Sequence, residues 1–253
     1  MSATPTCHIG PLGLSGVLAA RPEQATRDRR GFVAVLGPPA VGKSTVSEAL
    51  ADRLGGRVFR LREFAYDYRS QPGVDERLFD TTDALGWFGE QTVAVLLDAA
   101  FLHAQFSAPD LIVLENLPGS LPQLQLVDRL ARSLGAALAV VELTAPDSAV
   151  AARARTRRVC LTCEPDPRRD PHRPASPSTH NPDQCGHCGG QLRRRHGDHP
   201  HLFAIRLERF RSRIPTIRRE AAALQLPYQA VDATCDPSTC LKHTEAALAA
   251  AVT

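Results

Sequence analysis

The chain has 253 residues, of which 43% are hydrophobic and 23% are charged. This length and composition are typical of one α/β domain of ordinary size that carries a small insertion. The apolar runs are only as long as strands, which excludes a membrane-spanning helix. The formal net charge of +3 is too small to indicate nucleic-acid binding by itself.

The N-terminal residues 1–30 are predicted to form a disordered tail ahead of the folded domain, residues 31–253. An apolar stretch at residues 12–20 has no basic region before it and runs into Arg21, which argues against a signal peptide. Seven cysteines, an odd number, fit a disulfide framework poorly. Both observations favour a reducing compartment, and we expect a soluble, cytoplasmic protein.

The first elements of the domain follow directly. A continuous apolar run at residues 32–36 predicts a buried parallel strand. A helix is expected from Lys43, with Val46, Leu50 and Leu54 on one face and two glycines at its end. Residues 58–59 predict a short strand. Residues 62–106 look helical, with breaks near residues 71–73 and Gly86 and a core helix at 92–103.

The rest of the chain continues to alternate between strands and helices. Strands are expected at residues 111–114, 138–143 and 228–231. Helices are expected after the break at 117–119, at 148–158, at 202–224 with an interruption at Pro215, and at the alanine-rich C-terminus. This alternation predicts a parallel sheet with helices on both faces.

Residues 37–44 match the motif G-x-x-x-x-G-K-[ST], between a buried strand and an amphipathic helix as the motif requires. Backbone N–H groups at such a helix N-terminus face phosphates, Lys43 reaches the β- and γ-phosphates, and the Ser44 hydroxyl is placed to ligate Mg²⁺. The chain has only one other lysine, which argues against a chance match. The predicted ATP-binding residues are Gly37, Pro38, Pro39, Ala40, Val41, Gly42, Lys43, Ser44, Thr45 and Glu115.

Glu115 directly follows the strand at residues 111–114. Active sites of parallel sheets lie at the C-terminal ends of the strands, and P-loop folds often carry an acid near Mg²⁺ there. We therefore favour a role near Mg²⁺ over a solvated loop glutamate.

Residues 159–200 break the alternation of strands and helices. Between Cys163 and Cys185 the one aliphatic residue outside the prolines is Ala175, so this segment cannot build a hydrophobic core. Two C-x-x-C pairs bound the segment, which is the ligand spacing of a tetrahedral structural zinc site; the alternative is four unrelated thiols. The predicted zinc ligands are Cys160, Cys163, Cys185 and Cys188.

Arginines flank this segment on both sides: Arg153, Arg157 and Arg158 before it, and Arg193, Arg194, Arg195 and Arg206 after it. Forked guanidinium groups suit phosphoryl oxygens and the charge that develops in a transition state. A solvated basic face or a nucleic-acid patch fits the composition equally well. The predicted catalytic residues are Lys43, Arg153, Arg157, Arg195 and Arg206.

The order of these motifs resembles that of the adenylate kinase family of nucleoside monophosphate kinases, in the form whose long lid holds zinc through four cysteines. The family's R-x-x-x-R-R is similar to residues 153–158, its R-x-D-D to residues 195–198, and its D-G-F-P-R-T-x-x-Q-A to residues 115–124. The resemblance implies a three-layer α/β P-loop NTPase fold with a five-stranded parallel sheet in the order 2-3-1-4-5. It also implies a helical acceptor-binding part at residues 60–90 and a zinc-binding lid at 159–200.

By this resemblance the protein is a kinase that moves the γ-phosphoryl group of Mg-ATP onto a nucleoside monophosphate, with Arg62 and Gln123 binding the acceptor. Three departures from the family pattern are visible. Gly119 stands in place of the phosphate-binding arginine, Glu115 replaces an aspartate, and residues 61–66 do not keep the family's T-G-D-x-L-R. Arg60, Arg62 or Arg69 are the candidates to compensate.

Two other readings remain open: a kinase of a modified nucleotide or non-nucleotide metabolite, and a non-catalytic nucleotide-binding regulator. A zinc-ribbon nucleic-acid binder is disfavoured, because the cysteine segment has no aromatic residue to stack on bases. We expect a monomer whose partner is a small molecule and neither nucleic acid nor membrane.

Overall fold

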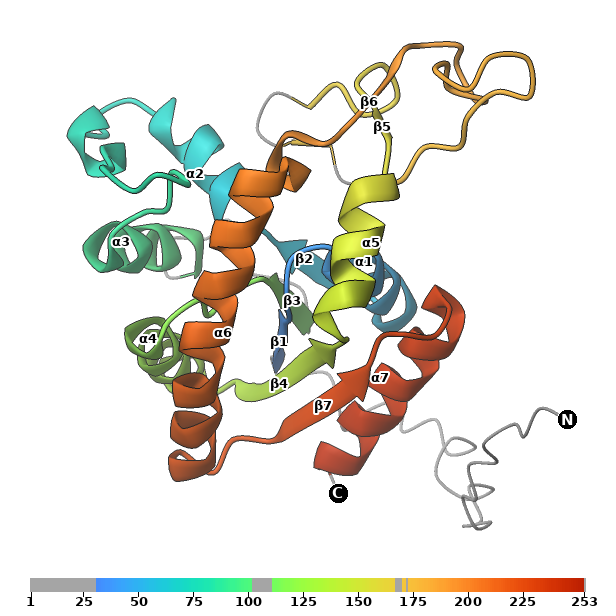
Figure 1. The fold of residues 1–253 in the computed structure, drawn as a ribbon. Coiled ribbons are helices and arrows are strands. Elements are labelled where there is room, and N and C mark those ends of the chain that lie inside the picture. The colour runs from blue at the N-terminus through green and yellow to red at the C-terminus, as the bar shows by residue number, and fades with distance from the viewer. Residues whose placement is uncertain (1–30, 102–110, 167–169, 172, 253) are drawn as a thin grey trace, which may run out of the picture.

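The fold, seen in a computed structural model that describes residues 31–101, 111–166, 170–171 and 173–252, centres on a parallel sheet (Figure 1). The predicted tail at residues 1–30 lies outside this part of the chain. The strands are β1 (Gly31–Leu36), β2 (Arg57–Phe59), β3 (Leu111–Glu115), β4 (Ala137–Thr144) and β7 (Tyr228–Asp232). Their order is β2-β3-β1-β4-β7, and every pair is parallel. Counted along the chain this is 2-3-1-4-5, so the predicted fold is confirmed.

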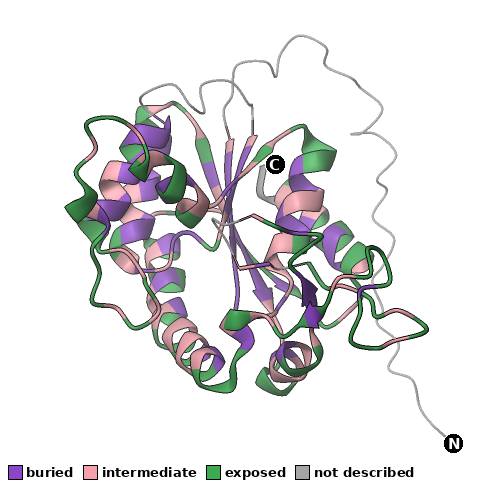
Figure 2. Ribbon diagram, turned by 90° about the horizontal axis from the view of Figure 1, so that it is seen from above, coloured by how far each residue is buried: buried purple, intermediate pink, exposed green. Residues whose placement is uncertain are grey.

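Successive side chains of β1 point to opposite faces of the sheet and join two separate cores. Phe32, Ala34 and Leu36 pack with α3 (Glu90–Phe101), α4 (Leu121–Ser133) and α6 (Pro200–Ala223). Val33 and Val35 pack with α1 (Lys43–Leu54), α5 (Asp147–Thr156) and α7 (Pro237–Val252). Figure 2 shows these two helical layers on either side of the sheet. The continuous apolar run of β1 reflects burial on both faces.

The prediction of helix over most of residues 62–89 is wrong in part. The structure has α2 (Leu61–Arg69) and a short 3₁₀ turn, η1 (Glu76–Phe79), but residues 80–89 form a loop. The carboxylate of Asp83 accepts hydrogen bonds from the backbone N–H groups of Leu85 and Trp87, at 2.8 and 3.4 Å. Such side-chain bonds offer the backbone an alternative to a helix. The predicted core helix is present as α3, and its end beyond residue 101 lies outside the described residues.

The predicted interruption at Pro215 is also wrong, because α6 runs unbroken from Pro200 to Ala223. Proline removes one backbone donor and crowds the preceding turn, which ordinarily destabilises a helix. Here Ile214 and Ile217, on either side of the proline, are buried against the sheet. Packing of the apolar face therefore overrides the local preference.

The cysteine segment is an insertion between α5 and α6 and stands clear of the sheet (Figure 1). Its secondary structure consists of an antiparallel pair, β5 (Val159–Cys160) and β6 (Leu192–Arg193), followed by the 3₁₀ turn η2 (His196–Asp198). Its apolar cluster holds only Cys160, Cys185 and Leu192, with Ala175 packed against it. Among the described helices, none combines the length and apolar character needed to cross a membrane.

Candidate active site

The loop between β1 and α1 has the geometry of a phosphate cradle. Gly42, the N-cap of α1, has φ of 110°, and Gly37 has φ of 149°. A Cβ on Gly37 would lie 2.7 Å from the Leu143 carbonyl oxygen, so only glycine fits against β4. The N-terminus of α1 therefore points its backbone N–H groups into the space above the sheet, where an anion is favoured.

Lys43, the first residue of α1, lies across this loop. Its Nζ donates hydrogen bonds to the carbonyl oxygens of Gly37 at 2.7 Å and Pro38 at 2.9 Å. Burial lowers the pKa of Lys43 to about 7, and the positive charge of Arg206 lowers it further, while Glu115 opposes the shift. An ammonium group destabilised in this way gains from the arrival of negatively charged phosphates.

Ser44 and Glu115 meet where α1 starts and β3 ends. The Ser44 hydroxyl donates to Glu115 Oε1 at 2.5 Å. The other oxygen of Glu115 accepts from Arg60 Nε at 2.6 Å. A serine hydroxyl next to a carboxylate is the kind of oxygen pair that holds Mg²⁺ in P-loop proteins, so the two residues fit the predicted metal role.

Three of the predicted arginines converge above the loop from the insertion and from α6. Arg157 makes a two-pronged ion pair with the buried Asp198, with both bonds at 2.7 Å. Arg195 donates to the Pro171 carbonyl at 2.9 Å, and Arg206 donates to the Gly197 carbonyl at 2.8 Å. Their charges all act on Lys43, and burial together with Arg195 lowers the pKa of Arg206 to about 10. The site thus concentrates positive charge in a desolvated place.

Arg153 is placed differently from the other predicted catalytic residues. Its guanidinium donates to the Val41 carbonyl at 3.1 Å and to the Ala233 carbonyl at 2.8 Å. It therefore ties the phosphate loop to the segment that follows β7. The side chain still lines the cavity described next, but backbone carbonyls occupy its donors.

One cavity of about 980 Å³ joins all of these groups. It is bounded by the loop at Ala40–Val46, by the insertion arginines and by the segment after β7, and it extends past Glu115 to α2 and the N-terminal end of α4. Gly37, Pro38 and Pro39 form the start of the loop and are not among the lining residues, whereas Thr45 is. We call the wall built from the lining residues between 60 and 123 the acceptor side.

On the acceptor side, Arg62 and Gln123 both line the cavity. Arg62 is exposed and donates to the Leu85 carbonyl at 3.1 Å. The Gln123 side-chain oxygen accepts from the Gly119 backbone N–H at 2.7 Å. Arg69, a third candidate to replace the missing family arginine, lies over the Phe79 ring at 5.7 Å and pairs with Glu76, and it is not among the residues lining the cavity.

Trp87 is a lining residue that the sequence analysis missed. Its ring closes off the place where the family's arginine would start, because a Cβ on Gly119 would lie 3.4 Å from it. Arg209 lies 4.5 Å from the ring centroid, and Arg213 lies 5.3 Å from it. A lone tryptophan in a stretch expected to be helical carried no motif that would have singled it out.

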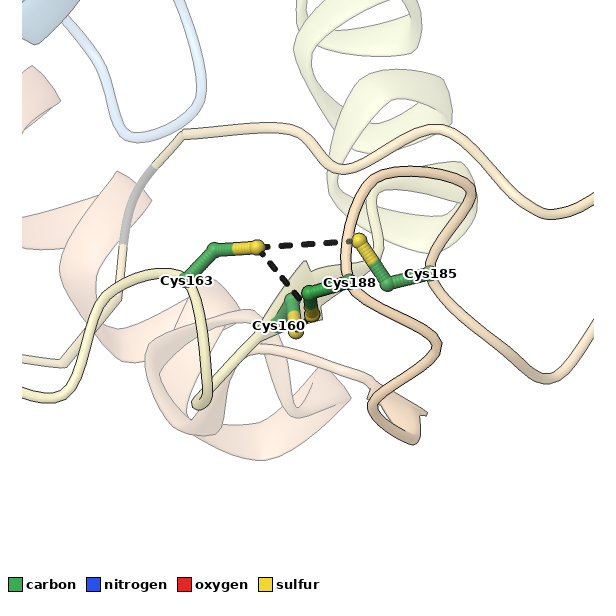
Figure 3. Close-up of side chains that lie close together, drawn as sticks. All are labelled: Cys160, Cys163, Cys185 and Cys188. Atoms are coloured by element: carbon green, nitrogen blue, oxygen red, sulfur yellow. Dashed lines mark hydrogen bonds between the residues drawn. The ribbon is translucent and has the colours of Figure 1, made fainter.

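The four predicted zinc ligands come together in the insertion (Figure 3). The sulfur of Cys163 is 3.3 Å from that of Cys188 and 3.7 Å from that of Cys185, and all four sulfurs lie within 4.8 Å of one another. A tetrahedral Zn²⁺ with Zn–S bonds of about 2.3 Å separates its sulfurs by roughly 3.8 Å. The cluster therefore fits a structural zinc ion. Gly190 permits this close approach, because its Cβ would lie 3.2 Å from the Cys160 sulfur and 2.6 Å from the Thr162 hydroxyl.

Comparison with known proteins points to one group. A family model described as an AAA domain matches residues 33–169, which is more than half of the chain. An adenylate kinase of Symbiobacterium thermophilum is 28% identical over 192 residues, covering 71% of this chain and 81% of that protein. A putative adenylate kinase of Pyrococcus abyssi is 33% identical over 75 residues, covering 28% of this chain and 42% of that protein. The resemblance to adenylate kinases is thereby confirmed.

Proposed function

Because this chain belongs to the AAA domain family, we propose that it is an ATP-dependent phosphotransferase of the adenylate kinase type. It transfers the γ-phosphoryl group of Mg-ATP to a small acceptor held in the same cavity. The supporting observation is that the phosphate loop, three converging arginines and a separate acceptor side share one cavity of about 980 Å³. Such an arrangement brings donor and acceptor together without a protein nucleophile.

On the donor side, the phosphates of ATP lie against the N-terminus of α1 and draw the Lys43 ammonium away from the two loop carbonyls. Ser44 and Glu115 would hold the magnesium ion with its waters. When bound, Mg²⁺ neutralises charge on the β- and γ-phosphates. Adenine lies against the segment after β7, where Ala233, Cys235 and Pro237 line the cavity.

The insertion acts as a lid over the transferring group. Arg157 is fixed by the buried Asp198, so its guanidinium fork is held in place before ATP arrives. Arg195 and Arg206 add positive charge where the transition state spreads negative charge over the phosphoryl oxygens. Closure of such a lid excludes water and protects ATP from hydrolysis.

A non-catalytic regulator is the competing proposal from another class. Binding ATP requires the loop and Lys43 but no cluster of cations beyond the γ-phosphate. Desolvating three arginines beside a lysine is unfavourable for the free protein, and phosphoryl transfer gives that arrangement a purpose. An assay of ADP formation across a panel of acceptors decides between the two proposals.

The acceptor that the relatives' names imply is a nucleoside monophosphate. We nevertheless expect AMP to be a poor acceptor. A charge-assisted contact to phosphate contributes about 1.5–3 kcal/mol, or roughly ten- to a hundredfold in binding, and Gly119 cannot supply one. We expect kcat/KM for AMP to be at least about a hundredfold lower than that of a typical adenylate kinase measured in parallel.

Two variants decide the opposite outcome. If AMP turns over as fast as in that reference enzyme, the expectation is wrong and another arginine holds its phosphate. Arg62→Ala should then raise KM for AMP strongly, because Arg62 lines the cavity. Arg69→Ala is the matched control, since that side chain lies over Phe79 and not at the cavity.

A further inference from the structure

The acceptor side carries little net positive charge. Among its described lining residues, Arg60 and Arg62 are cations, and Glu63 and Glu115 are anions. A phosphomonoester brings close to two negative charges at neutral pH. A site that binds such a group ordinarily offers it two or more guanidinium groups that are not already paired.

Arg60 is already surrounded by carboxylates. Its guanidinium lies 2.6 Å from Glu115, 2.7 Å from Glu48 and 3.8 Å from Glu63. An acceptor phosphate that approached Arg60 would meet these three negative groups at the same time. Arg62 is left as the remaining cation of this wall, and it is exposed to solvent, where a single contact contributes little.

Aromatic and apolar groups take the place of the missing charge. Trp87 lines the cavity beside Leu85, Phe88 and Val93. The Trp87 loop is rigidly held: Asp83 accepts from its backbone and also pairs with Arg209 on α6 at 2.8 Å. Arg213 donates to the Gly119 carbonyl at 3.2 Å, so that arginine is spent on the backbone and is not among the lining residues. A preorganised indole of this kind suits a planar ring.

From this balance we propose that the acceptor is an uncharged compound with a planar ring and a free hydroxyl, of the nucleoside class, and that the hydroxyl itself is phosphorylated. This inference rests on the proposed ATP-dependent transfer. The ring lies against Trp87, and the hydroxyl points towards the γ-phosphate between Glu63 and Glu115.

The chemistry of this step balances without any further reactant. The hydroxyl oxygen forms a bond to the γ-phosphorus while the bond from that phosphorus to the β,γ-bridging oxygen breaks. The bridging oxygen keeps the electron pair and leaves as part of ADP. The hydroxyl proton passes to the carboxylate of Glu63, a cavity-lining group on α2, and then to water. An acceptor phosphate would need no such base, so Glu63 is the catalytic residue that sets the two reactions apart.

Matched pairs of acceptors test the proposal on the full chain with Mg-ATP. Adenosine, guanosine, cytidine and uridine are each compared with their own 5′-monophosphate, so that the two members of a pair differ only in the phosphate. We expect at least one nucleoside to have a kcat/KM more than tenfold above that of its monophosphate. ³¹P NMR should identify the product as a phosphomonoester and not a phosphoanhydride.

Two variants and a binding signal supplement this assay. Glu63→Gln should lower kcat for the nucleoside by about a hundredfold or more with ATP affinity unchanged, whereas Glu76→Gln, an exposed site outside the cavity, should have no effect. Trp87→Leu should raise KM for the nucleoside, and Trp87→Phe should restore it. Trp87 is the chain's single tryptophan, so its fluorescence should change on nucleoside addition in the presence of a non-hydrolysable ATP analogue.

Three results would overturn the inference: faster turnover of the monophosphates, a phosphoanhydride product, or neither turnover nor a fluorescence change with any nucleoside. Failure of the proposed function itself looks different. In that case calorimetry finds no ATP binding to the wild-type chain, or ATP binds but ADP formation is unaffected by loss of Lys43.

Discussion

Replacing Lys43 by alanine is expected to reduce phosphoryl transfer by at least two to three orders of magnitude. Removing one preorganised donor that faces developing charge typically lowers kcat by about 10²–10³-fold. In the free protein the ammonium contacts only the Gly37 and Pro38 carbonyls and belongs to neither hydrophobic core. The fold should therefore survive the change. Measurement of kcat for ADP formation, together with thermal unfolding of both proteins, checks the two parts of this expectation.

The chain supplies an unusually clean control for this experiment. Its other lysine, Lys242, is exposed on α7, which packs on the same face of the sheet as α1. Lys242→Ala removes the same charge and the same side chain without approaching the phosphates. Near-native transfer by Lys43→Ala, or an equal loss in both variants, would contradict the assignment of the phosphate loop.

Loss of one cysteine of the cluster is expected to abolish zinc binding. The purified protein should carry about one zinc ion per chain, since a closed four-cysteine site holds one ion, and Cys185→Ser should carry almost none. Structural zinc contributes roughly 10–16 kcal/mol in small metal-dependent folds. The apolar cluster of the insertion, only Cys160, Cys185 and Leu192, offers no substitute. Elemental analysis measures the metal.

The change should loosen the insertion and leave the sheet intact. Trypsin should cut Cys185→Ser rapidly at the arginines of the insertion, such as Arg173 and Arg193, while far-ultraviolet circular dichroism stays close to that of the wild type. Cys235→Ser is the matched control, because that thiol lies after β7 and outside the cluster. A wild-type chain without metal and with an insertion that resists trypsin would refute the zinc site.

Local preference and tertiary context disagreed at two places in the fold. At Pro215 the sequence pattern indicates a break, but burial of Ile214 and Ile217 keeps α6 continuous. At residues 80–89 helix propensity misled the prediction, because it does not record that Asp83 bonds backbone N–H groups two and four residues further on. Short-range side-chain bonds of this kind change an element without changing its hydrophobic pattern.

The candidate site divides in the same way. Residues of the phosphate loop and the four cysteines could be assigned in advance because each group is contiguous, or nearly so, in a spacing that the chemistry requires. The acceptor side could not. It is built by α2, the Trp87 loop and the start of α4, which are far apart in sequence, and the neutralisation of Arg60 by Glu48 and Glu115 depends on distances that no spacing encodes.

By itself, the sequence determined the parallel α/β fold, the phosphate loop and the zinc ligands, because hydrophobic period and ligand spacing are local properties that survive in any packing of the chain. Tertiary structure alone decided which charges remain available. It placed Arg153 on backbone carbonyls, enclosed Arg60 among carboxylates and set Trp87 against Gly119. Whether an arginine can bind a phosphate depends on what already surrounds it, and only the folded chain brings those neighbours together.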